Sequence, residues 1–300
     1  MTNISVLIVA NGNPPHLIKS IESVESLASE IIIIDIGLTK EAQNSLLSLN
    51  LVTIIQEEPV EYVELLREKS KQYAKNNYIL MLDPDEIVPK QLSDRLLDEY
   101  DKYDFISIPR KNIIFGKWIQ HSRWWPDHQI RLFKKDSVTW SKKLHAQPKT
   151  KGNGLQIEPE EQFALTHHNY ESLDEYMTKM MRYAKADAQM HVSSEETFTL
   201  SQALSQGSSE FISRFFVADG YKDGMHGFTL SFMQLMYYPL VYFYYWEGRK
   251  YENVETKIII SDAETFAKTL LYEILHWLSV KNITYSTSNL KRRIIRKLLK

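Results

Sequence analysis

The 300-residue chain contains no cysteine, which excludes disulfide bonds and thiolate metal sites. It has no excess of basic residues: the formal charge is −2 and the isoelectric point is near 6.5, which argues against nucleic-acid binding. It also lacks a glycine-rich phosphate loop ending in Lys-Ser/Thr, a nucleophile elbow and a zinc-ligand spacing. These absences exclude several enzyme classes, and they leave a chain long enough to bury a large core.

The N-terminal region lacks the features of a secretory signal. No lysine or arginine precedes the apolar run at residues 6–10, and this run is shorter than the core of a signal peptide. We interpret the run as a buried strand, and we expect the protein in the cytoplasm.

The spacing of apolar residues follows two different patterns along the chain. In roughly the first third, short β-rich runs alternate with longer segments of helical period. The runs are residues 4–9, 31–34, 52–55 and 78–82, and the helical segments are residues 15–27, 40–49 and 60–74. Such runs, joined by helices, predict an α/β fold with an open, mostly parallel sheet flanked by helices. Ligands of this fold bind at the carboxyl ends of the strands.

The pattern changes after about residue 105. Residues 105–109, 129–133 and 162–166 are predicted strands between loops rich in Trp, His and Lys, and the chain is helical in pattern from residue 173 onward. We therefore expect an α/β domain over residues 1–170 and a helical region over residues 171–300.

The strongest chemical signal is Asp83-Pro84-Asp85-Glu86, directly after the predicted strand 78–82. Two carboxylates at positions i and i+2 on such a turn can converge at the ligand edge of a sheet. Because like charges repel, convergence favours a cation between them, and hard oxygen ligands suit Mg²⁺ or Mn²⁺ bound to substrate phosphates. The alternative is a solvated acidic turn before a helix that begins near Pro89.

Five segments of the sequence carry polar or aromatic residues in distinctive combinations. They are residues 6–11 with 16–24, residues 78–86, Trp125-Pro126-Asp127-His128-Gln129-Ile130-Arg131-Leu132-Phe133, Thr166-His167-His168-Asn169-Tyr170 with Tyr183-Ala184, and Asp223-Gly224-Met225-His226-Gly227-Phe228. Together they resemble the motifs of the family 2 glycosyltransferases of the GT-A fold, most of all the branch of the lipopolysaccharide-core glucosyltransferases. Residues 125–133 carry the most specific likeness, to W-Y-P-D-x-Q-x-R-L-F. The likeness runs from residue 4 to about residue 247.

The resemblance implies roles for individual residues. Asn11 and Asp35 would contact the nucleotide part of the donor, and Asp83 and Asp85 would hold the metal and the donor diphosphate. Arg131 would either face a phosphate or pair with a structural carboxylate. His168 would be a further metal or phosphate contact, or simply a hydrogen-bonded, half-buried histidine. Trp118, Trp124 and Trp125 would stack on sugar rings or fill a core.

Two departures from the family pattern lie in the predicted nucleotide pocket. Gly12 replaces an acid of the first loop, and Lys40 stands where the family has the second aspartate after the strand ending at Asp35. These changes leave open which nucleotide base the donor carries.

A third departure bears on the mechanism, because Ala146 follows His145 where the family has a glutamate. An inverting transferase needs a carboxylate that takes the proton of the acceptor hydroxyl, a contribution of about 10²–10⁴-fold. Asp127 or Asp223 is the candidate substitute. We favour Asp127 as the catalytic base, because an aromatic loop is expected to raise its pKa. The alternative is that Asp127 is a turn residue after Pro126.

Two C-terminal segments indicate a membrane surface. Residues 227–246 carry no formal charge, but Pro239, Gln234 and five tyrosines favour an interfacial helix over a membrane span. A core helix is the alternative. Closer to the C-terminus, apolar residues fall on one helical face and six cations cover the rest, which suits an anionic leaflet, with a solvated tail as the alternative. These cations are Lys291, Arg292, Arg293, Arg296, Lys297 and Lys300.

The patterns and the resemblance together predict a metal-dependent, inverting glycosyltransferase, peripheral on the inner face of the cell membrane. It would move a sugar from a nucleoside diphosphate sugar to a hydroxyl of a glycan or lipid-linked acceptor, in cell-envelope polysaccharide or lipopolysaccharide synthesis. One alternative is a polyprenyl-phosphate sugar synthase, whose phosphate acceptor lessens the need for a base. The other is a non-catalytic, membrane-bound adaptor on a decayed transferase scaffold.

Overall fold

The computed structural model describes residues 2–60, 64–141, 147–194 and 197–283. The chain forms two compact units, one of residues 1–113 with 125–169 and the other of residues 114–124 with 170–300. The first unit ends next to the expected boundary near residue 170. The segment Ile114–Trp124 belongs to the second unit, which the sequence pattern does not indicate.

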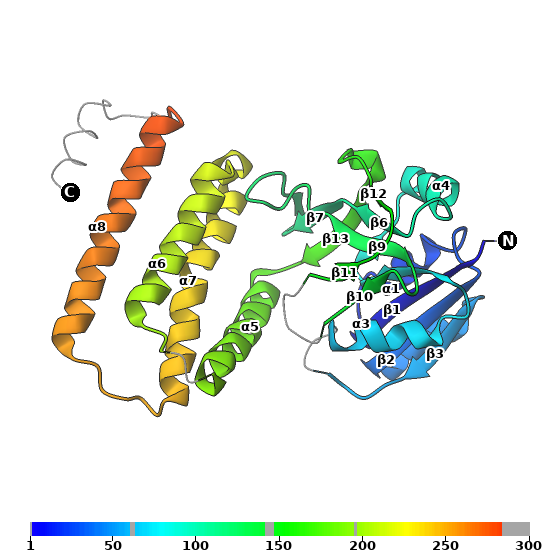
Figure 1. Ribbon diagram of the computed structural model, residues 1–300, viewed down its shortest axis with the longest axis horizontal. Coiled ribbons are helices and arrows are strands. Elements are labelled where there is room, and N and C mark those ends of the chain that lie inside the picture. Colours follow the sequence, from blue (N-terminus) through cyan, green and yellow to red (C-terminus); the bar gives the residue numbers. More distant parts are fainter. Residues whose placement is uncertain (1, 61–63, 142–146, 195–196, 284–300) are drawn as a thin grey trace. The chain divides into compact units, whose positions relative to one another are not determined.

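A seven-stranded sheet forms the centre of the first unit, in the order β12-β6-β9-β4-β1-β2-β3 (Figure 1). β1 to β4 pair in parallel, whereas β9 runs antiparallel between β4 and β6. The prediction of an α/β fold with an open, mostly parallel sheet is confirmed. The strands are β1 (Ile4–Gly12), β2 (Glu30–Leu38), β3 (Val52–Gln56), β4 (Tyr78–Leu82), β6 (Phe105–Ile108), β9 (Gln129–Lys134) and β12 (Gly154–Gln156).

Helices cover both faces of this sheet. On one face, α1 (Leu17–Glu22), α2 (Lys40–Leu47) and α4 (Lys90–Glu99) contribute Ile21, Leu46 and Leu96 to a core with the even-numbered residues of β1. On the other face, α3 (Glu64–Ser70) contributes Leu66, and a 3₁₀ turn, η1 (Lys71–Tyr73), follows. Successive side chains of a strand point to opposite faces, so the continuous apolar runs of β1 and β2 fill both cores.

A smaller sheet in the same unit includes β5 (Glu86–Ile87), β13 (Leu165–Tyr170) and β7 (Arg110–Ile114). β5 pairs antiparallel with β13, which places His167 opposite Glu86. The predicted strand at residues 162–166 is wrong in position, because a 3₁₀ turn, η2 (Glu161–Phe163), comes first and the alternation of buried residues begins at Leu165. β10 (Val138–Thr139) and β11 (Lys149–Thr150) form a separate short pair.

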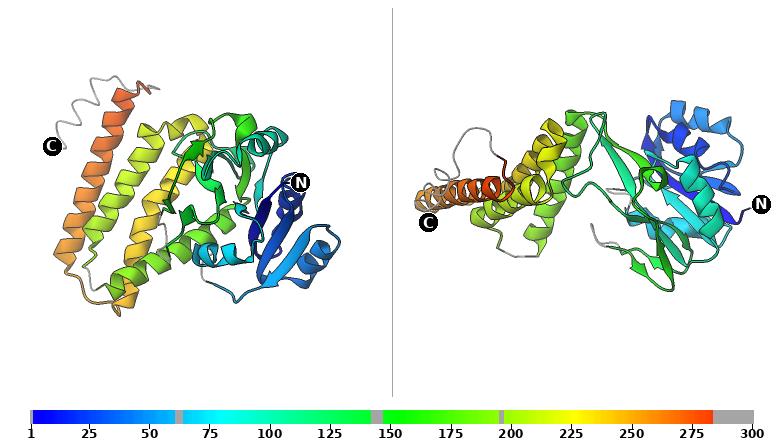
Figure 2. Two further views of the ribbon diagram at one scale, coloured as in Figure 1. Left: turned by 45° about the vertical axis from the view of Figure 1, so that its right-hand side comes forward. Right: turned by 90° about the horizontal axis from the view of Figure 1, so that it is seen from above.

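Among the described residues beyond 170, the second unit is mostly helical, as predicted. α6 lies between α7 and α8, and α7 lies between α5 and α6 (Figures 1 and 2). A Cβ on Gly207 of α6 would lie 2.3 Å from the carbonyl oxygen of Leu235, so glycine permits the close approach of α6 and α7. The elements are β8 (Lys117–Trp118), α5 (Leu173–Ser193), α6 (Leu200–Ile212), the π-helical turn η3 (Ser213–Val217), η4 (Gly220–Asp223), α7 (Met225–Gly248) and α8 (Thr256–Val280).

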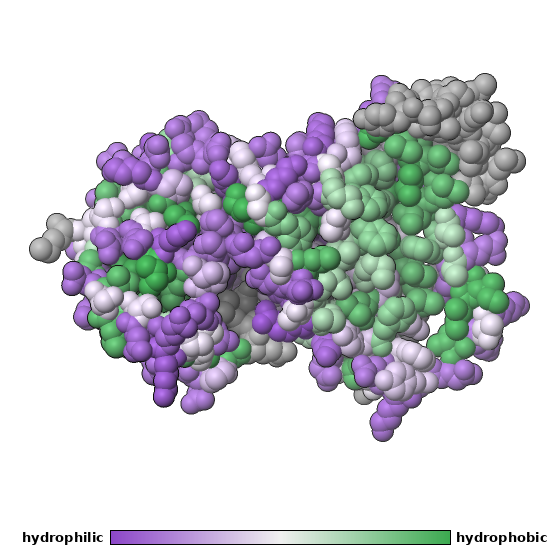
Figure 3. Space-filling view, turned by 180° about the vertical axis from the view of Figure 1, so that it is seen from behind, coloured by the Kyte–Doolittle hydropathy of each residue, from purple (hydrophilic) through white to green (hydrophobic). Residues whose placement is uncertain are grey.

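α7 combines a buried face with an exposed apolar face. Leu230, Leu235 and Val241 are buried, whereas Phe232 and Met236 are 39% and 43% exposed. Hydrophobic residues cover much of the visible surface of this helical unit (Figure 3). Within the described residues, we find no helix with the length and apolar character needed to cross a bilayer. The predicted basic, amphipathic segment after residue 288 lies outside the described residues.

Candidate active site

Three predicted site residues lie at one edge of the main sheet. Asn11 is near the end of β1, Asp35 is in the last part of β2, and Asp83 follows β4 directly. β1 pairs in parallel with both β2 and β4, so the carboxyl ends of the three strands are adjacent. Ligands of open α/β sheets bind at this edge.

Asp35 is fully buried and uses both carboxylate oxygens inside the protein. Oδ1 accepts hydrogen bonds from the backbone N–H groups of Gly37 (2.8 Å) and Leu38 (2.6 Å). Oδ2 accepts hydrogen bonds from Nε2 of Gln43 (2.7 Å) and Gln56 (2.6 Å). Burial raises the pKa of Asp35, but these hydrogen bonds outweigh burial, and the pKa lies below its ordinary value. Four hydrogen bonds fill the acceptor positions of a carboxylate, so Asp35 holds the loop after β2 in place.

Asn11 is exposed and lies over this same loop. Gly37 has a φ of +129°, and a Cβ at this position would lie 2.8 Å from Asn11 Oδ1. Only glycine adopts such a φ readily and leaves room for the asparagine. Asn11 therefore borders the backbone that Asp35 organises.

Asp83 is held by three arginines. Arg67 Nη2 lies 3.2 Å from Asp83 Oδ1, Arg110 Nη1 lies 3.9 Å from Oδ2, and Arg131 Nη2 donates a hydrogen bond to Oδ2. Burial raises the pKa of Asp83, but the three guanidinium groups hold it far below its ordinary value. Asp83 is therefore ionised at neutral pH, and its charge is already compensated by the protein.

Glu86, the last residue of the acidic turn, is also fully buried. Its Oε1 accepts hydrogen bonds from Arg131 Nη2 (2.5 Å) and Arg110 Nη1 (3.3 Å), and its Oε2 accepts one from the backbone N–H of Asp83 (3.1 Å). Arg131 is 2% exposed, so it lies beneath the turn and pairs with structural carboxylates. Of the two expectations for Arg131, the contacts favour the structural one.

Asp127 lies just before β9 and faces Arg110. Its Oδ2 accepts hydrogen bonds from Arg110 Nε (2.9 Å) and Asn112 Nδ2 (3.1 Å), and its Oδ1 accepts one from Gln129 Nε2 (2.9 Å). The predicted rise of its pKa is wrong. Burial raises the pKa of Asp127, but the Arg110 guanidinium and these hydrogen bonds lower it by more. Asp127 is thus a carboxylate at neutral pH, and its orientation is fixed.

Asp223, the other candidate base, is a buried residue of the second unit. It accepts hydrogen bonds from the backbone N–H groups of Gln120 (3.4 Å) and His121 (2.9 Å), and its Oδ1 lies 3.2 Å from His121 Nδ1. These contacts attach the segment Ile114–Trp124 to the start of α7. They favour a structural role for Asp223. The departure at Ala146 falls outside the described residues.

Asp85 faces His167. His167 Nε2 lies 3.6 Å from Asp85 Oδ1, and His167 Nδ1 lies 2.6 Å from Oδ1 of the buried Asn112. Asn112 in turn donates a hydrogen bond to Asp127. A continuous series of side chains therefore connects the acidic turn after β4 to the candidate base.

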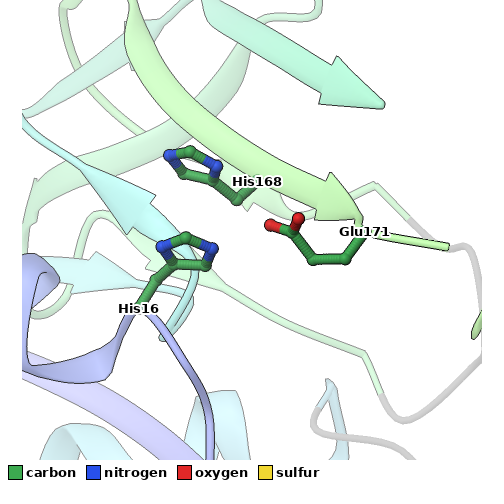
Figure 4. A group of neighbouring side chains, drawn as sticks. All are labelled: His16, His168 and Glu171. Atoms are coloured by element: carbon green, nitrogen blue, oxygen red, sulfur yellow. The ribbon is translucent and has the colours of Figure 1, made fainter. Parts of the chain in front are cut away.

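The side chain of His168 points to the opposite face of β13 from that of His167. Its ring stacks on the ring of His16 at the start of α1, with a centroid distance of 3.9 Å and an interplanar angle of 15° (Figure 4). Figure 4 also draws Glu171, which follows β13 in the chain. Among the described residues, His16, His168 and Glu171 form a group of three side chains whose potential metal-ligand atoms lie within 4.8 Å of one another. Neither Asp83 nor Asp85 belongs to this group.

Sequence reasoning missed five residues of this site: Arg67, Arg110, Asn112, His167 and, as a buried anchor, Glu86. Glu86 and His167 lie inside motifs that the sequence shows, but the sequence did not indicate their roles. The other three come from α3 and β7, where no local pattern marks a polar residue as part of a site. Among the tryptophans, Trp124 packs with the apolar cluster of Ile114, Tyr176 and Leu230 in the second unit, which favours its core role.

No protein-family model matches the sequence. Among solved structures, TarS 1–349 of S. aureus is 8% identical, with a TM-score of 0.40 over 92% of this chain and 80% of that chain. The galactosyltransferase LgtC, in complex with donor and acceptor sugar analogues, is 17% identical, with a TM-score of 0.29 over 36% of this chain and 47% of that chain. The bifunctional IspDF of Campylobacter jejuni is 16% identical, with a TM-score of 0.39 over 57% and 53%. The chain therefore spans about half the length of the last two proteins, and none of these likenesses identifies a substrate.

Proposed function

We propose that the chain is a glycosyltransferase that moves a sugar from a nucleoside diphosphate sugar to an acceptor hydroxyl with inversion. One observation carries this proposal: the acidic turn after β4 lies at the ligand edge of the sheet and is joined there by two half-buried arginines. The side chains of Arg67 and Arg110 are 16% and 15% exposed, so both combine a fixed position with access to solvent. Guanidinium groups of this kind suit a diphosphate, and carboxylates suit its Mg²⁺ or Mn²⁺ ion.

The donor would lie along the carboxyl ends of β1, β2 and β4. Its nucleotide would rest on the loop that Asp35 organises and that Asn11 borders. Its diphosphate would replace part of the contacts that Arg67 and Arg110 make with Asp83. When bound, the divalent cation would neutralise charge on the leaving diphosphate.

Asp127 would act as the catalytic base. The acceptor oxygen attacks the anomeric carbon from the face opposite the diphosphate, the bond from carbon to phosphate oxygen breaks, and the hydroxyl proton passes to a carboxylate oxygen of Asp127. Its lowered pKa keeps Asp127 ionised at neutral pH, and the hydrogen bonds from Arg110, Asn112 and Gln129 hold its direction.

The acceptor would be a glycan or a lipid-linked glycan of the cell envelope, such as lipopolysaccharide, handled at the cytoplasmic face of the membrane. The exposed apolar face of α7 and the basic residues after Leu290 support an interfacial attachment.

One observation favours the polyprenyl-phosphate sugar synthase as a second candidate. The ion pair with Arg110 makes Asp127 a weak base, and a phosphate acceptor carries no proton that must be removed at neutral pH. The two candidates separate in a product assay that offers the same labelled donor a glycan acceptor or a polyprenyl phosphate.

The proposed function is tested by thermal shift with a panel of nucleoside diphosphate sugars, each with and without Mn²⁺. We expect stabilisation by one donor that depends on the metal and is lost in Asp85→Asn. Asp94→Asn is the matched control, because Asp94 is an exposed acid on α4 that pairs with Lys90. Absence of stabilisation across the whole panel would support the non-catalytic adaptor instead.

A further inference from the structure

The helical unit has a groove of its own. A cavity of about 420 Å³ lies between α6 and α8, the helices that run side by side in Figures 1 and 2. It is lined by residues of α6, the η3 turn and α8, so it belongs entirely to the second unit. On α8 it extends from Asp262 to Trp277, about 22 Å along the helix axis. A groove of this size holds a small ligand or a stretch of an extended one.

Polar residues line the groove at positions where two packed helices usually place apolar side chains. Asp262, Thr269 and Glu273 are separated by seven and four residues, so they lie on one face of α8. Ser201 and Ser205 of α6 line the groove at a spacing of four residues. Short hydroxyl side chains do not fill the space between two helices, and α8 has no buried residue along its whole length. The sequence of this helix pair therefore leaves a gap between α6 and α8.

Side chains in the groove keep hydrogen-bonding capacity that the protein does not use. Within the residues that the structure describes, the half-buried carboxylates of Asp262 and Glu273 make no hydrogen bond or ion pair. Over the same residues, the hydroxyls of Ser205, Thr265 and Thr269 make no hydrogen bond either. A carboxylate offers acceptors, whereas a hydroxyl both donates and accepts. The groove therefore presents mixed hydrogen-bonding groups to its occupant.

Two aromatic rings line the groove, and both are held by the core of the helical unit. Phe266 and Trp277 pack on an apolar cluster that includes Phe211 and Ile212 of α6. A ring held in this way offers a preformed apolar surface, so little freedom is lost when a ligand binds. The face of an indole suits the C–H groups on one side of a pyranose, because both surfaces are apolar and nearly flat. The groove thus combines a stacking surface with hydrogen-bonding walls.

The charges of the groove argue against three other classes of occupant. Among the described lining residues, Asp262 and Glu273 carry the only charges, so a phosphate or another anion would be repelled. A hydrocarbon chain would desolvate both carboxylates without replacing their hydrogen bonds to water. A single cationic group cannot serve both carboxylates, because eleven residues of helix separate them by about 16 Å. A cation also leaves the hydroxyl donors of the groove unused.

We propose that the groove between α6 and α8 is a binding site for an uncharged oligosaccharide. Each hydroxyl of a sugar both donates and accepts, so it pairs with the carboxylates as a donor and with the serine and threonine hydroxyls in either direction. Trp277 would stack on one ring of the sugar chain. This inference goes beyond the proposed function, because the site needs no transfer chemistry. In a transferase with a glycan acceptor, the groove would hold sugar units other than the one that reacts.

The experiment uses the full chain with its six tryptophans replaced by 5-fluorotryptophan, so that fluorine NMR reports each indole separately. The Trp277 signal is assigned by its loss in Trp277→Phe. The probes are maltohexaose, cellohexaose and the hexamer of N-acetylglucosamine, each at millimolar concentration. We expect at least one of them to shift the Trp277 signal saturably. Trp246 of α7 lies outside the groove and is the internal control, whose signal should stay in place.

Substitutions in the groove test the same site by calorimetry with the oligosaccharide that binds. Ser205→Leu should weaken binding at least tenfold, because it removes both space and a hydroxyl from the groove. Gln206→Leu is the matched control, since this exposed neighbour on α6 does not line the groove and should leave the affinity unchanged. Asp262→Asn keeps the size of the side chain and should weaken binding several-fold, because a charged acceptor forms the stronger hydrogen bond.

The proposal is overturned if none of the three sugars shifts the Trp277 signal, or if Trp277 and Trp246 shift alike. Unchanged affinity in a folded Ser205→Leu would also overturn it. A Trp277 shift produced by farnesol or by spermine, but by none of the sugars, would assign the groove to a hydrocarbon chain or to a cation instead. Saturable binding of a sugar by a chain that transfers none would uphold the groove and count only against the transferase.

Discussion

Arg131 Nη2 donates a 2.5 Å hydrogen bond to Glu86 Oε1, and the two side chains are 2% and 0% exposed. Arg131 lies on β9, and Glu86 ends the acidic turn after β4. β4 and β9 are neighbouring antiparallel strands, so the pair attaches the turn to the strand beside it. The first and last acids of the D-x-D-E segment, Asp83 and Glu86, are therefore held by a buried arginine before any ligand binds.

Arg131→Met is predicted to be strongly destabilising. It leaves Glu86 buried beside an apolar side chain, and removing one member of a buried ion pair typically costs about 3–5 kcal/mol. Urea unfolding measures this loss, and Lys90→Met, which breaks the exposed pair with Asp94, should change stability little. If Arg131→Met kept its stability but lost affinity for pyrophosphate, Arg131 would be a phosphate ligand instead.

Stability is predicted to fall below about pH 4. Asp35, Asp83 and Asp127 all have a pKa lowered by folding, whereas an aspartate in an unfolded chain titrates near 3.9. A group with a lowered pKa contributes stability above the unfolded value, and this stability is lost as the pH falls through the folded value. The free energy of unfolding, measured by urea titration from pH 7 to 2.5, should therefore decline most steeply at the acid end.

Asp35→Asn isolates the share of one carboxylate in this pH dependence. The amide loses part of the hydrogen bonding with Gly37, Leu38 and the two glutamines, so stability at pH 7 falls and the acid-end decline becomes shallower. Asp94→Asn, an exposed acid, should leave both features unchanged. An unaltered slope in Asp35→Asn would mean that the other carboxylates account for the whole decline.

The main sheet was predictable because its signal is local. The runs at residues 4–9, 31–34, 52–55 and 78–82 are rich in apolar, β-branched residues, and each coincides with one of β1 to β4. The acidic turn was predictable for the same reason, since a single short segment follows one strand. What lies within a few residues of a buried strand can be recognised without knowing the tertiary structure.

The partners of the acids were not predictable, because they come from distant segments. Asp83 meets Arg67, Arg110 and Arg131, which are separated from it by 16, 27 and 48 residues of sequence. Arg110 also lowers the pKa of Asp127, although the aromatic loop around Asp127 had led us to expect a raised pKa. Nothing in the sequence near Asp127 indicates that Arg110 lies beside it. The choice between His167 and His168 depends on which face of β13 is turned to β5, and adjacent histidines look alike in sequence.

Asp127→Asn is predicted to lower kcat by about 10²–10⁴-fold with a hydroxyl acceptor, the usual contribution of a catalytic base. With its lowered pKa, Asp127 stays ionised below the ordinary range, so the acid limb of wild-type activity should lie below pH 4, or be masked by unfolding. Steady-state kinetics on a folded variant measures this. Gln129→Glu is unsuitable as a control because it contacts Asp127; Gln162→Glu, exposed on η2, is suitable. Full activity of Asp127→Asn with polyprenyl phosphate would favour the synthase.

The exposed face of α7 is predicted to contribute to membrane attachment. Phe232→Glu places a charge among apolar side chains that would enter the headgroup region, so vesicle co-sedimentation should fall. Met190→Glu makes the same kind of change on α5, at a residue that is 52% exposed, and should have no effect.

Truncation after residue 287 tests the other half of the attachment. It removes six cations, each worth on the order of 1 kcal/mol near anionic lipid, so binding to vesicles containing phosphatidylglycerol should weaken most at low salt. Neutral vesicles should bind the full and truncated chains equally, because the truncation removes only the electrostatic attraction to anionic lipid. Combining the truncation with Phe232→Glu should abolish co-sedimentation, since one change removes the charge attraction and the other removes the apolar contact. Undiminished binding of the combined variant would place the attachment elsewhere in the chain, or show that vesicle binding is non-specific.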